Sequence, residues 1–184
     1  MTPAPRPGSK EEARRKAQRS AIGWLWLSLT DIVLDQITKL YIMANFELYD
    51  RIEVLPVFDI TRLHNTGAAF SFLAGAGGWQ RWFFITLGIV VSSLVVAWLA
   101  RLPVKGRAWL AAALALAVGG AVGNVIDRIW LGYVVDFISV HYNDWYFPAF
   151  NVADSAITVG AIILLIESLL GEDGRIPSGR EHET

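Results

Sequence analysis

Two aspartates near the C-terminal end of the chain lie in apolar surroundings and have the residue type needed for acid–base chemistry. Asp136 lies in the stretch VVDF and Asp154 in FNVADS, and neither has a lysine or arginine close to it in sequence. A carboxylate costs at least ~2.5 kcal/mol to insert beside hydrocarbon, so an intramembrane acid indicates a functional site. Two carboxylates held together cannot both ionise readily, so the pair shares a proton. One carboxyl is then a base toward water and the other an acid toward a carbonyl, which is how aspartic proteases hydrolyse peptides.

Six further polar residues occur at spacings that place them side by side on helices. They are Asp31, Asp35 and Lys39 in one segment and Asn124, Asp127 and Arg128 in another. Residues four apart share one face of a helix. With a rise of 1.5 Å per residue, the second group lies ~24 Å above the start of its helix, at the height expected for both aspartates. The sequence therefore predicts that these groups converge in one layer near the outer side of a membrane.

Structural explanations remain open for some of these residues. Arg128 could extend to the outer surface, with Asp127 as its ion-pair partner. Asp35 and Lys39 could form only a structural ion pair, and we favour that interpretation for them. Asp136 and Asp154 are harder to explain in this way, because their neighbours are apolar and no cation is close to either in sequence.

The composition indicates a membrane protein. Of 184 residues, 54% are hydrophobic, 18% are charged and eight are tryptophan, whereas a soluble domain has ~25% charged residues. The net charge of -1 gives no reason to expect a nucleic-acid partner. The absence of cysteine excludes disulfides, thiolate ligands and a cysteine nucleophile. The three histidines are scattered, so we expect neither a metal site nor another cofactor.

Four segments are long and apolar enough to cross a bilayer, which needs ~20 residues of helix. They are residues 21–43, 82–100, 108–130 and 152–170. The first follows basic residues like a signal peptide, but no small-x-small cleavage site follows it, so we expect a retained helix. In the third, Gly119, Gly120 and Gly123 include a GxxxG pattern that lets helices approach closely. The sequence predicts an all-α membrane protein with four transmembrane helices.

The distribution of lysine and arginine predicts the orientation of these helices. The N-terminal tail holds six such residues, and the loop between the second and third helices holds three. Residues 44–79 hold two, and residues 131–151 hold none. Both termini and the middle loop are therefore expected in the cytoplasm.

The segments outside the helices have different expected structures. Residues 44–79 are rich in β-branched and aromatic residues, which predicts a small strand-containing platform. Residues 131–151 lack a helical period and are expected to form an aromatic loop at the outer interface. The basic tail 1–20 and the tail 171–184 are expected to be disordered, which leaves 21–170 as one membrane-embedded domain.

Five sequence blocks together resemble the lipoprotein signal peptidase (signal peptidase II) family. They are DQITK (35–39), RLHNTGAAFSFL (62–73), GGAVGNVIDR (119–128), VVDF (134–137) and FNVADS (150–155), in the family's order. The resemblance implies a bacterial inner-membrane aspartyl endopeptidase with a periplasmic β-cradle and an active site near the periplasmic face. Such an enzyme removes the signal peptide from diacylglyceryl-modified prolipoproteins by cutting before the lipidated cysteine. The implied partners are that lipidated signal peptide and membrane lipid, and we expect a monomer.

The resemblance also implies roles for individual residues. Asp136 and Asp154 match the catalytic dyad. The residues that match the family's supporting positions are Asn65, Gly67, Asn124, Arg128 and Asn151, with Asp35 and Lys39 as a mainly structural pair.

Three expectations about these supporting residues can be compared with a structure. Asn124 and Arg128 are expected to hold the loop that bears Asp136. Asn65 is expected to offer its amide to the substrate backbone, within a cradle or lid formed by residues 44–79. Gly67 is expected to supply a backbone turn that a larger residue would strain.

Three other classes of protein are less consistent with the sequence. A proton-coupled transporter would have polar groups near the midplane of several helices. A serine–lysine protease would use Lys39 with Ser71, Ser139 or Ser155 and needs an uncharged lysine, but Asp35 on the same helix face favours the charged form. A structural scaffold would not need so many polar groups within the membrane.

Overall fold

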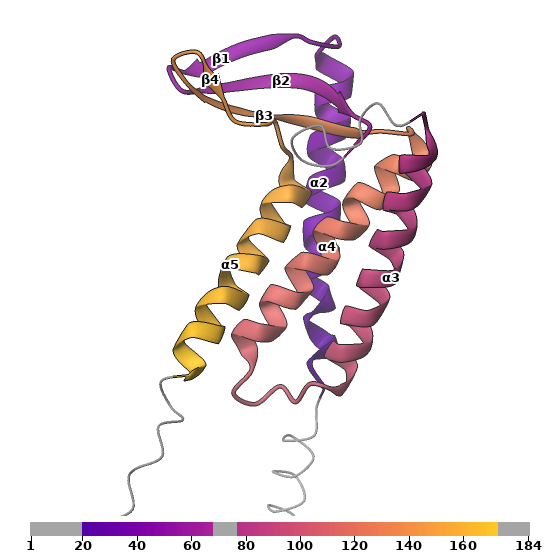
Figure 1. Cartoon of the computed structure of the whole chain (residues 1–184), viewed down its shortest axis with the longest axis vertical. Helices are drawn as coiled ribbons and strands as arrows, with labels where there is room; N and C mark the ends of the chain where they lie inside the picture. Colours follow the sequence, from indigo (N-terminus) through magenta and orange to yellow (C-terminus); the bar gives the residue numbers. More distant parts are fainter. Residues whose placement is uncertain (1–19, 68–76, 173–184) are drawn as a thin grey trace, which may run out of the picture.

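The computed structural model describes residues 20–67 and 77–172 and shows a helical bundle beneath an antiparallel sheet (Figure 1). The helices are η1 (Ala21–Trp24, a 3-10 helix), α2 (Leu25–Asn45), α3 (Trp79–Arg101), α4 (Ala108–Trp130) and α5 (Val152–Glu172). The strands are β1 (Arg51–Leu55), β2 (Phe58–Asn65), β3 (Val134–Tyr142) and β4 (Trp145–Tyr146). Of the tails expected to be disordered, residues 1–19 and 173–184 lie outside the described residues, whereas Ser20 is described and residues 171 and 172 belong to α5.

Helix α4 is the central helix of the bundle and packs against α2, α3 and α5. Its glycines make this close packing possible. A Cβ atom at Gly123 would lie 2.8 Å from a carboxylate oxygen of Asp35 in α2, and one at Gly120 would clash with the carbonyl oxygen of Ala153 in α5. The prediction that these glycines let helices approach closely is confirmed.

Helices α3, α4 and α5 are long and apolar enough to span a membrane. Helix α2 has 21 residues but contains three ionisable side chains. Asp31, Asp35 and Lys39 point inward and are 6%, 0% and 1% exposed, while the outward side chains of α2 include Leu29 and Ile37 at 63% and 57%. The outer surface of α2 is therefore apolar, and its polar stripe is covered by the other helices.

Helix α3 begins three residues earlier than the sequence predicted. Gly77 and Gly78 have φ angles of 77° and 97°, a conformation that glycine adopts without strain, and the helix starts directly after them at Trp79.

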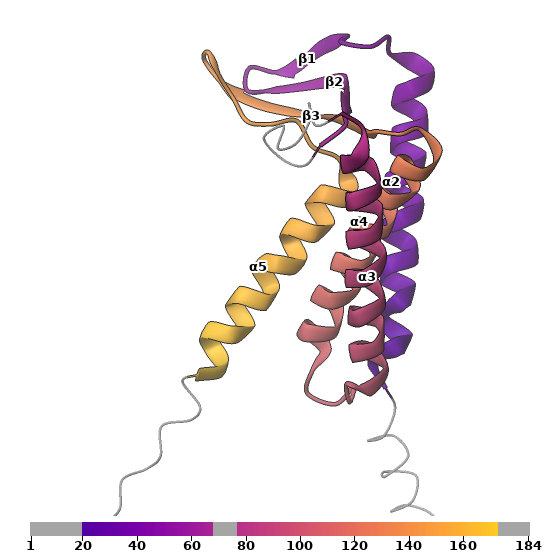
Figure 2. The same cartoon turned by 45° about the vertical axis from the view of Figure 1, so that its right-hand side comes forward.

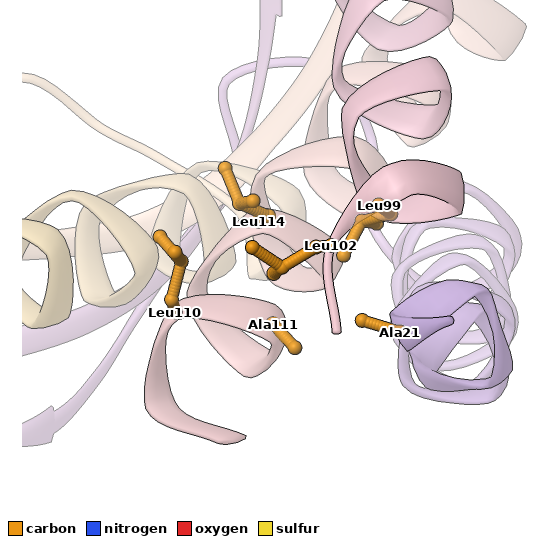
Figure 3. Close-up of a cluster of buried hydrophobic side chains, with 6 residues drawn as sticks. All are labelled: Ala21, Leu99, Leu102, Leu110, Ala111 and Leu114. Carbon is orange, nitrogen blue, oxygen red and sulfur yellow. The ribbon is translucent and has the colours of Figure 1, made fainter. Parts of the chain in front are cut away.

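An apolar cluster closes the bundle at the end far from the sheet (Figure 3). It consists of Ala21, Leu99, Leu102, Leu110, Ala111 and Leu114. The N–H of Ala21 donates to the carbonyl oxygen of Leu102 at 2.8 Å, which joins η1 to the connection between α3 and α4.

The four strands form one sheet in the order β1-β2-β3-β4 across the other end of the bundle (Figures 1 and 2). Strands β2 and β3 pair antiparallel, with Leu63 opposite Asp136 and Asn65 opposite Val134. The register shifts between Ile60 and Leu63, so β2 has an irregularity just before the residues that face Asp136. This pairing brings Asn65 beside Asp136.

The expectation of an aromatic loop over residues 131–151 is wrong, because this segment contains β3 and β4. Strand β3 is buried on both faces in its first half. Val135 and Phe137 pack against Ile42 of α2, while Asp136 on the other face is also buried. A strand covered on both sides lacks the alternation of polar and apolar residues that identifies a half-exposed strand. The fold is therefore a helical bundle with a four-stranded sheet, rather than an all-α protein whose strands are confined to residues 44–79.

Candidate active site

Asp136 of β3 and Asp154 of α5 are joined through the side chain of Asn151. The Asn151 amide nitrogen donates to Oδ1 of Asp136 at 2.7 Å. Its amide oxygen accepts the backbone N–H of Asp154 at 2.9 Å, as expected of an asparagine that caps the N-terminus of a helix. One amide side chain thus contacts both segments that bear the predicted aspartates.

Asp136 is held by two amide donors in a buried position. Asn65 of β2 donates to Oδ2 at 3.0 Å, and Asn151 donates to Oδ1. Burial raises the pKa of Asp136 to about 7, and the carboxylate of Asp154 adds to this rise, while the two amide donors oppose it. A carboxyl with this pKa exchanges its proton near neutral pH.

Asp154 lies in the first turn of α5, where the helix dipole favours negative charge. The amide nitrogen of Asn124 in α4 donates to its Oδ1 at 2.7 Å. The amide oxygen of Asn124 accepts from Nζ of Lys39 at 3.0 Å, so the lysine determines which end of the amide faces Asp154.

Lys39 also forms two ion pairs that are almost wholly buried. Its Nζ lies 2.8 Å from Asp35 and 2.9 Å from Asp127. Gln36 donates to the same two carboxylates, at 3.2 Å to Asp35 and 2.9 Å to Asp127. We call Asp35, Lys39 and Asp127 the lysine network.

Both carboxylates of the lysine network bind backbone groups next to the predicted aspartates. Asp127 accepts the N–H of Val135 at 3.1 Å, and Asp35 accepts the N–H of Ala153 at 2.9 Å. The expectation that Asp35 and Lys39 form an ion pair is confirmed, and the pair adjoins the site.

Arg128 is buried and does not extend to the surface. Its guanidinium donates to the carbonyl oxygen of Gly67 at 2.6 Å and lies 4.9 Å from the ring centre of Phe84 in α3. Because Asp127 forms its ion pair with Lys39, the interpretation of Arg128 as a surface residue paired with Asp127 is wrong.

The expectation that Asn124 and Arg128 hold the segment 131–151 is wrong for Arg128 and right for Asn124 only at the end of that segment. The amide oxygen of Asn124 accepts from Asn151 at 3.4 Å, while its nitrogen donates to Asp154. Arg128 donates to Gly67 instead, and Asp127 accepts the N–H of Val135 beside Asp136. Helical spacing predicts which residues lie at the same height on one face. The hydrogen-bond partner of each residue depends on which backbone segment packs beside it.

Asn65 and Gly67 form a local turn beside Asp136. The amide oxygen of Asn65 accepts the N–H of Gly67 at 3.0 Å, which leaves its nitrogen directed at Asp136. The amide of Asn65 therefore faces a carboxylate, where the sequence predicted a contact with substrate. The motif continues to residue 73, and residues 68–76 lie outside the described part of the chain.

A cavity of about 550 Å³ lies beside these residues. Asn65, Asn124, Arg128 and Asp154 provide its polar wall. Residues 147–150 and apolar side chains of α5, such as Ile157, provide the rest. Asp136 does not line the cavity, but its hydrogen-bond partner Asn65 does. An apolar cavity with a few converging polar groups is typical of a ligand site.

The described residues contain no cluster of three His, Cys, Asp or Glu side chains that could hold a metal ion. They also pair Lys39 with no serine. Nζ of Lys39 contacts Asp35, Asp127 and Asn124, and Oγ of Ser155 donates to the carbonyl oxygen of Asn151. Ser71 lies outside the described residues.

Two residues of the site, Gln36 and Arg81, were not among the sequence predictions, and Asp127 was expected only as an ion-pair partner of Arg128. Gln36 lies within the quoted block DQITK, so its position was a usable signal. Arg81 of α3 had no signal: its guanidinium donates to the carbonyl oxygens of Arg128 and Ile129, at 2.7 and 2.9 Å, at the C-terminal end of α4. These carbonyls have no partner within the helix, so Arg81 fixes the turn that bears Arg128.

Comparisons with known proteins identify the family to which the chain belongs. A family model described as signal peptidase (SPase) II matches residues 27–170. The lipoprotein signal peptidase of Pseudomonas aeruginosa (strain UCBPP-PA14) is 57% identical over 146 residues, which is 78% of this chain and 86% of that protein. The lipoprotein signal peptidase of Pseudoalteromonas translucida (strain TAC 125) is 48% identical over 167 residues, which is 91% of this chain and 97% of that protein.

Two solved structures of bacterial membrane enzymes are similar in fold. One, at 2.3 Å resolution, has a TM-score of 0.73 and 30% sequence identity, and the match covers 86% of this chain and 94% of that one. The other, at 1.9 Å resolution, has a TM-score of 0.67 and 32% identity, over 80% of this chain and 92% of that one.

Proposed function

The chain belongs to the signal peptidase II family, and from this membership we propose that it is an aspartic endopeptidase of diacylglyceryl-modified prolipoproteins. It removes the signal peptide by cutting before the lipidated cysteine. The observation that supports this function best is the pair of carboxyl groups, Asp136 and Asp154, joined through Asn151 beside an apolar cavity.

The proposed reaction uses one ionised and one protonated carboxyl of this pair. The ionised carboxylate takes a proton from a water molecule, and the water oxygen bonds to the carbonyl carbon of the scissile peptide bond. The other carboxyl gives its proton to the carbonyl oxygen, which produces a tetrahedral diol. The C–N bond then breaks as the nitrogen receives the proton taken from water, and a hydroxyl of the diol returns a proton to the other carboxyl.

The pKa of Asp136 supports this division of roles. With a pKa of about 7, Asp136 can keep a proton at a pH where an exposed aspartate would be ionised. The amide donors Asn65 and Asn151 orient its two oxygens, and Asn124 orients Asp154. We assign Arg128 and Gly67 to holding the turn after β2 beside the cavity.

We propose four transmembrane helices, with α2 as the fourth beside α3, α4 and α5. The apolar outer surface of α2 suits lipid, and its ionisable side chains are covered by the bundle. The lysine and arginine residues then place both termini and the loop between α3 and α4 in the cytoplasm. The site would lie at the periplasmic face of the inner membrane, at the depth of the outer headgroups.

This placement suits a lipidated substrate. The cavity wall formed by α5 and residues 147–150 is mainly apolar, so acyl chains could stay in lipid while the scissile bond reaches the carboxyls. A single chain supplies both carboxyls, which is consistent with a monomer. A proton-coupled transporter is disfavoured, because the buried ion pairs lie at one end of the bundle.

The test is cleavage of a synthetic prolipoprotein peptide by the purified protein in detergent. The peptide carrying a diacylglyceryl-cysteine should be cut directly before that cysteine, and the same peptide without the lipid should not be cut at a comparable rate. Equal cleavage of both peptides would refute the substrate specificity, and no cleavage of either would refute the proposed function.

A further inference from the structure

The two predicted catalytic aspartates are each preceded by a residue whose backbone N–H is bound by a buried acid. Val135, just before Asp136, donates to Asp127 of α4, and Ala153, just before Asp154, donates to Asp35 of α2. The two contacts are alike in length, at 3.1 and 2.9 Å. The backbone next to each aspartate is therefore fixed by a hydrogen bond to a buried carboxylate.

The two acids that make these contacts are joined to each other. Lys39 pairs with both, and Gln36 donates to both. Asp35, Lys39 and Asp127 are 0%, 1% and 2% exposed, so the connection lies inside the bundle, away from the molecular surface. A continuous set of bonds leads from the backbone beside Asp136, through Lys39, to the backbone beside Asp154.

The lysine network has more bonds than a structural ion pair requires. A buried ion pair is often no more stabilising than apolar side chains of the same volume, because desolvation offsets the attraction. What charged hydrogen bonds provide is direction and a fixed length. Catalysis by two carboxyls that share a proton depends on their separation, and a misplacement of 1 Å can cost ~100-fold in rate.

We propose that Asp35, Lys39 and Asp127 are positioning residues that fix the separation of Asp136 and Asp154. Helix α2 supplies no described residue to the cavity wall, yet it determines the geometry of the pair through Asp35 and Lys39. This inference rests on the proposed function only for its catalytic consequence; the connection between the two aspartates can be measured without substrate.

The first experiment compares three isosteric variants, Asp35→Asn, Asp127→Asn and Asp31→Asn. In Asp35→Asn, the amide nitrogen must replace either the oxygen that accepts from Lys39 or the oxygen that accepts the N–H of Ala153. In Asp127→Asn, it must replace either the oxygen that accepts from Gln36 or the oxygen that accepts from both Lys39 and Val135. Each variant also loses the negative charge that pairs with Lys39, without a change in side-chain volume.

Asp31 is a matched control, because it is a buried acid one turn before Asp35 and its Oδ2 has no partner among the described residues. We expect kcat to fall on the order of tenfold to a hundredfold in Asp35→Asn and Asp127→Asn, with KM little changed, and to stay near wild type in Asp31→Asn.

The double variant Asp35→Asn/Asp127→Asn tests whether the two acids act as one unit. If they do, its kcat should be scarcely lower than that of either single variant. Losses that multiply would mean two independent structural contacts and would overturn the proposal. An equal loss in Asp31→Asn would overturn it as well, because the loss would then follow from removing any buried acid of α2 and not from breaking the lysine network.

A titration of Asp136 separates failure of this inference from failure of the proposed function. Carbon-13 NMR of aspartate-labelled protein can follow its carboxyl, with Asp136→Asn used for assignment. The charged or polar groups that influence it are Asp154 of α5, Lys39 of α2, Arg128 of α4, Asn65 of β2 and Asn151.

Loss of a carboxylate also leaves the charge of Lys39 less compensated, and Lys39 itself lowers the pKa of Asp136. The readout is therefore the amount by which Asp154 raises that pKa, measured as the difference between proteins with Asp154 and with Asp154→Asn. Moving the two aspartates apart should make this difference smaller in the Asp35→Asn and Asp127→Asn backgrounds and leave it unchanged in the Asp31→Asn background.

The outcomes of this titration are distinct from those of cleavage. If wild-type protein cleaves no lipidated peptide but the effect of Asp154 on the pKa of Asp136 falls in Asp35→Asn and Asp127→Asn, the proposed function fails and the connection stands. If wild-type protein cleaves the peptide and that effect is unchanged in Asp35→Asn, Asp35 does not fix the separation of the two aspartates and the inference fails. Thermal unfolding of each variant shows that the signals come from folded protein.

Discussion

The two ends of the helical bundle are both closely packed, but by different interactions. At the end far from the sheet, apolar side chains such as Leu99 and Leu114 fill the space between η1, α3 and α4 (Figure 3). At the sheet end, the space between α2, α4 and α5 holds the lysine network and the asparagines beside Asp136 and Asp154.

These interactions differ in what they fix. Burial of apolar surface is favourable in proportion to area and has no direction, so it stabilises the far end without requiring one arrangement of atoms. Hydrogen bonds and ion pairs have short lengths and preferred angles, and buried charges cost free energy that only good geometry offsets. We therefore expect substitutions at the sheet end to reduce turnover more than stability, and substitutions at the far end to do the reverse.

The largest expected effect at the sheet end is that of Asp136→Asn and Asp154→Asn. Each should lower kcat by ~10⁴-fold or more, because neither amide can take or give the required proton. The double variant should be scarcely worse than either single one, since the two carboxyls act as a unit. The measurement is single-turnover cleavage of the lipidated peptide. Substantial turnover in either variant would mean that other carboxyls perform the chemistry.

The next effect is that of Arg128→Ala, for which we expect a loss in kcat/KM on the order of a hundredfold. Without its guanidinium, the carbonyl of Gly67 loses a donor at 2.6 Å and the turn beside the cavity is released. Arg128→Lys should restore little, because an ammonium cannot reproduce the planar group that also lies over Phe84. Arg101→Ala, an exposed arginine at the far end, is the control. Full activity in Arg128→Ala would contradict this prediction. The sheet end would then differ from the far end only through the lysine network and the two carboxyls.

At the far end, Leu99→Ala should reverse the pattern. Leu99 is 0% exposed, so its truncation should lower the free energy of unfolding by ~2–5 kcal/mol. The kcat of the folded fraction should be unchanged, because this cluster shares no described residue with the cavity wall. Leu94→Ala removes a side chain that is 66% exposed on the same helix and should change stability little. A kcat loss in Leu99→Ala at a temperature where it is fully folded would show that the two ends are coupled.

The two ends also differ in how far sequence could predict them. The apolar far end and the helices followed from hydropathy and length, because these quantities are summed over many residues. The meeting of Asp136 and Asp154 also followed, since both lie at one height and match a family pattern. Strand β3 was missed because burial on both faces removes its alternation.

The contacts of single residues at the site could not be derived from sequence in the same way. The lysine network binds backbone N–H groups of Val135 and Ala153, and such groups are the same in every residue type. The choice of Gly67 over the Asp136 segment as the partner of Arg128 depends on where a strand ends. Neither the backbone hydrogen bonds of the lysine network nor the partner of Arg128 can be read from the pattern of side chains in the sequence.

The smallest expected effect is on the pH dependence of stability. Asp136 has a pKa of about 7 in the folded protein and ~3.9 in an unfolded chain. Between these values the folded state binds more protons than the unfolded state, so the free energy of unfolding falls as pH rises, by at most ~1.4 kcal/mol per pH unit. The contribution of Asp136 is fully present below pH ~4 and is lost as pH passes 7.

Asp136→Asn removes this titration, so its stability should decline less between pH 4 and 7, and near pH 8 it should be at least as stable as wild type. Leu99→Ala should lower stability by a similar amount at every pH, because an apolar side chain has no proton to bind. Thermal unfolding in detergent from pH 4 to 8, with wild type and both variants, measures the slopes. If wild type and Asp136→Asn had the same slope, Asp136 would be ionised in the folded protein as readily as in the unfolded chain. The raised pKa of Asp136 could then not account for the proton shared by the two aspartates. The sheet end would differ from the far end in its hydrogen-bond geometry but not in the pH dependence of its stability.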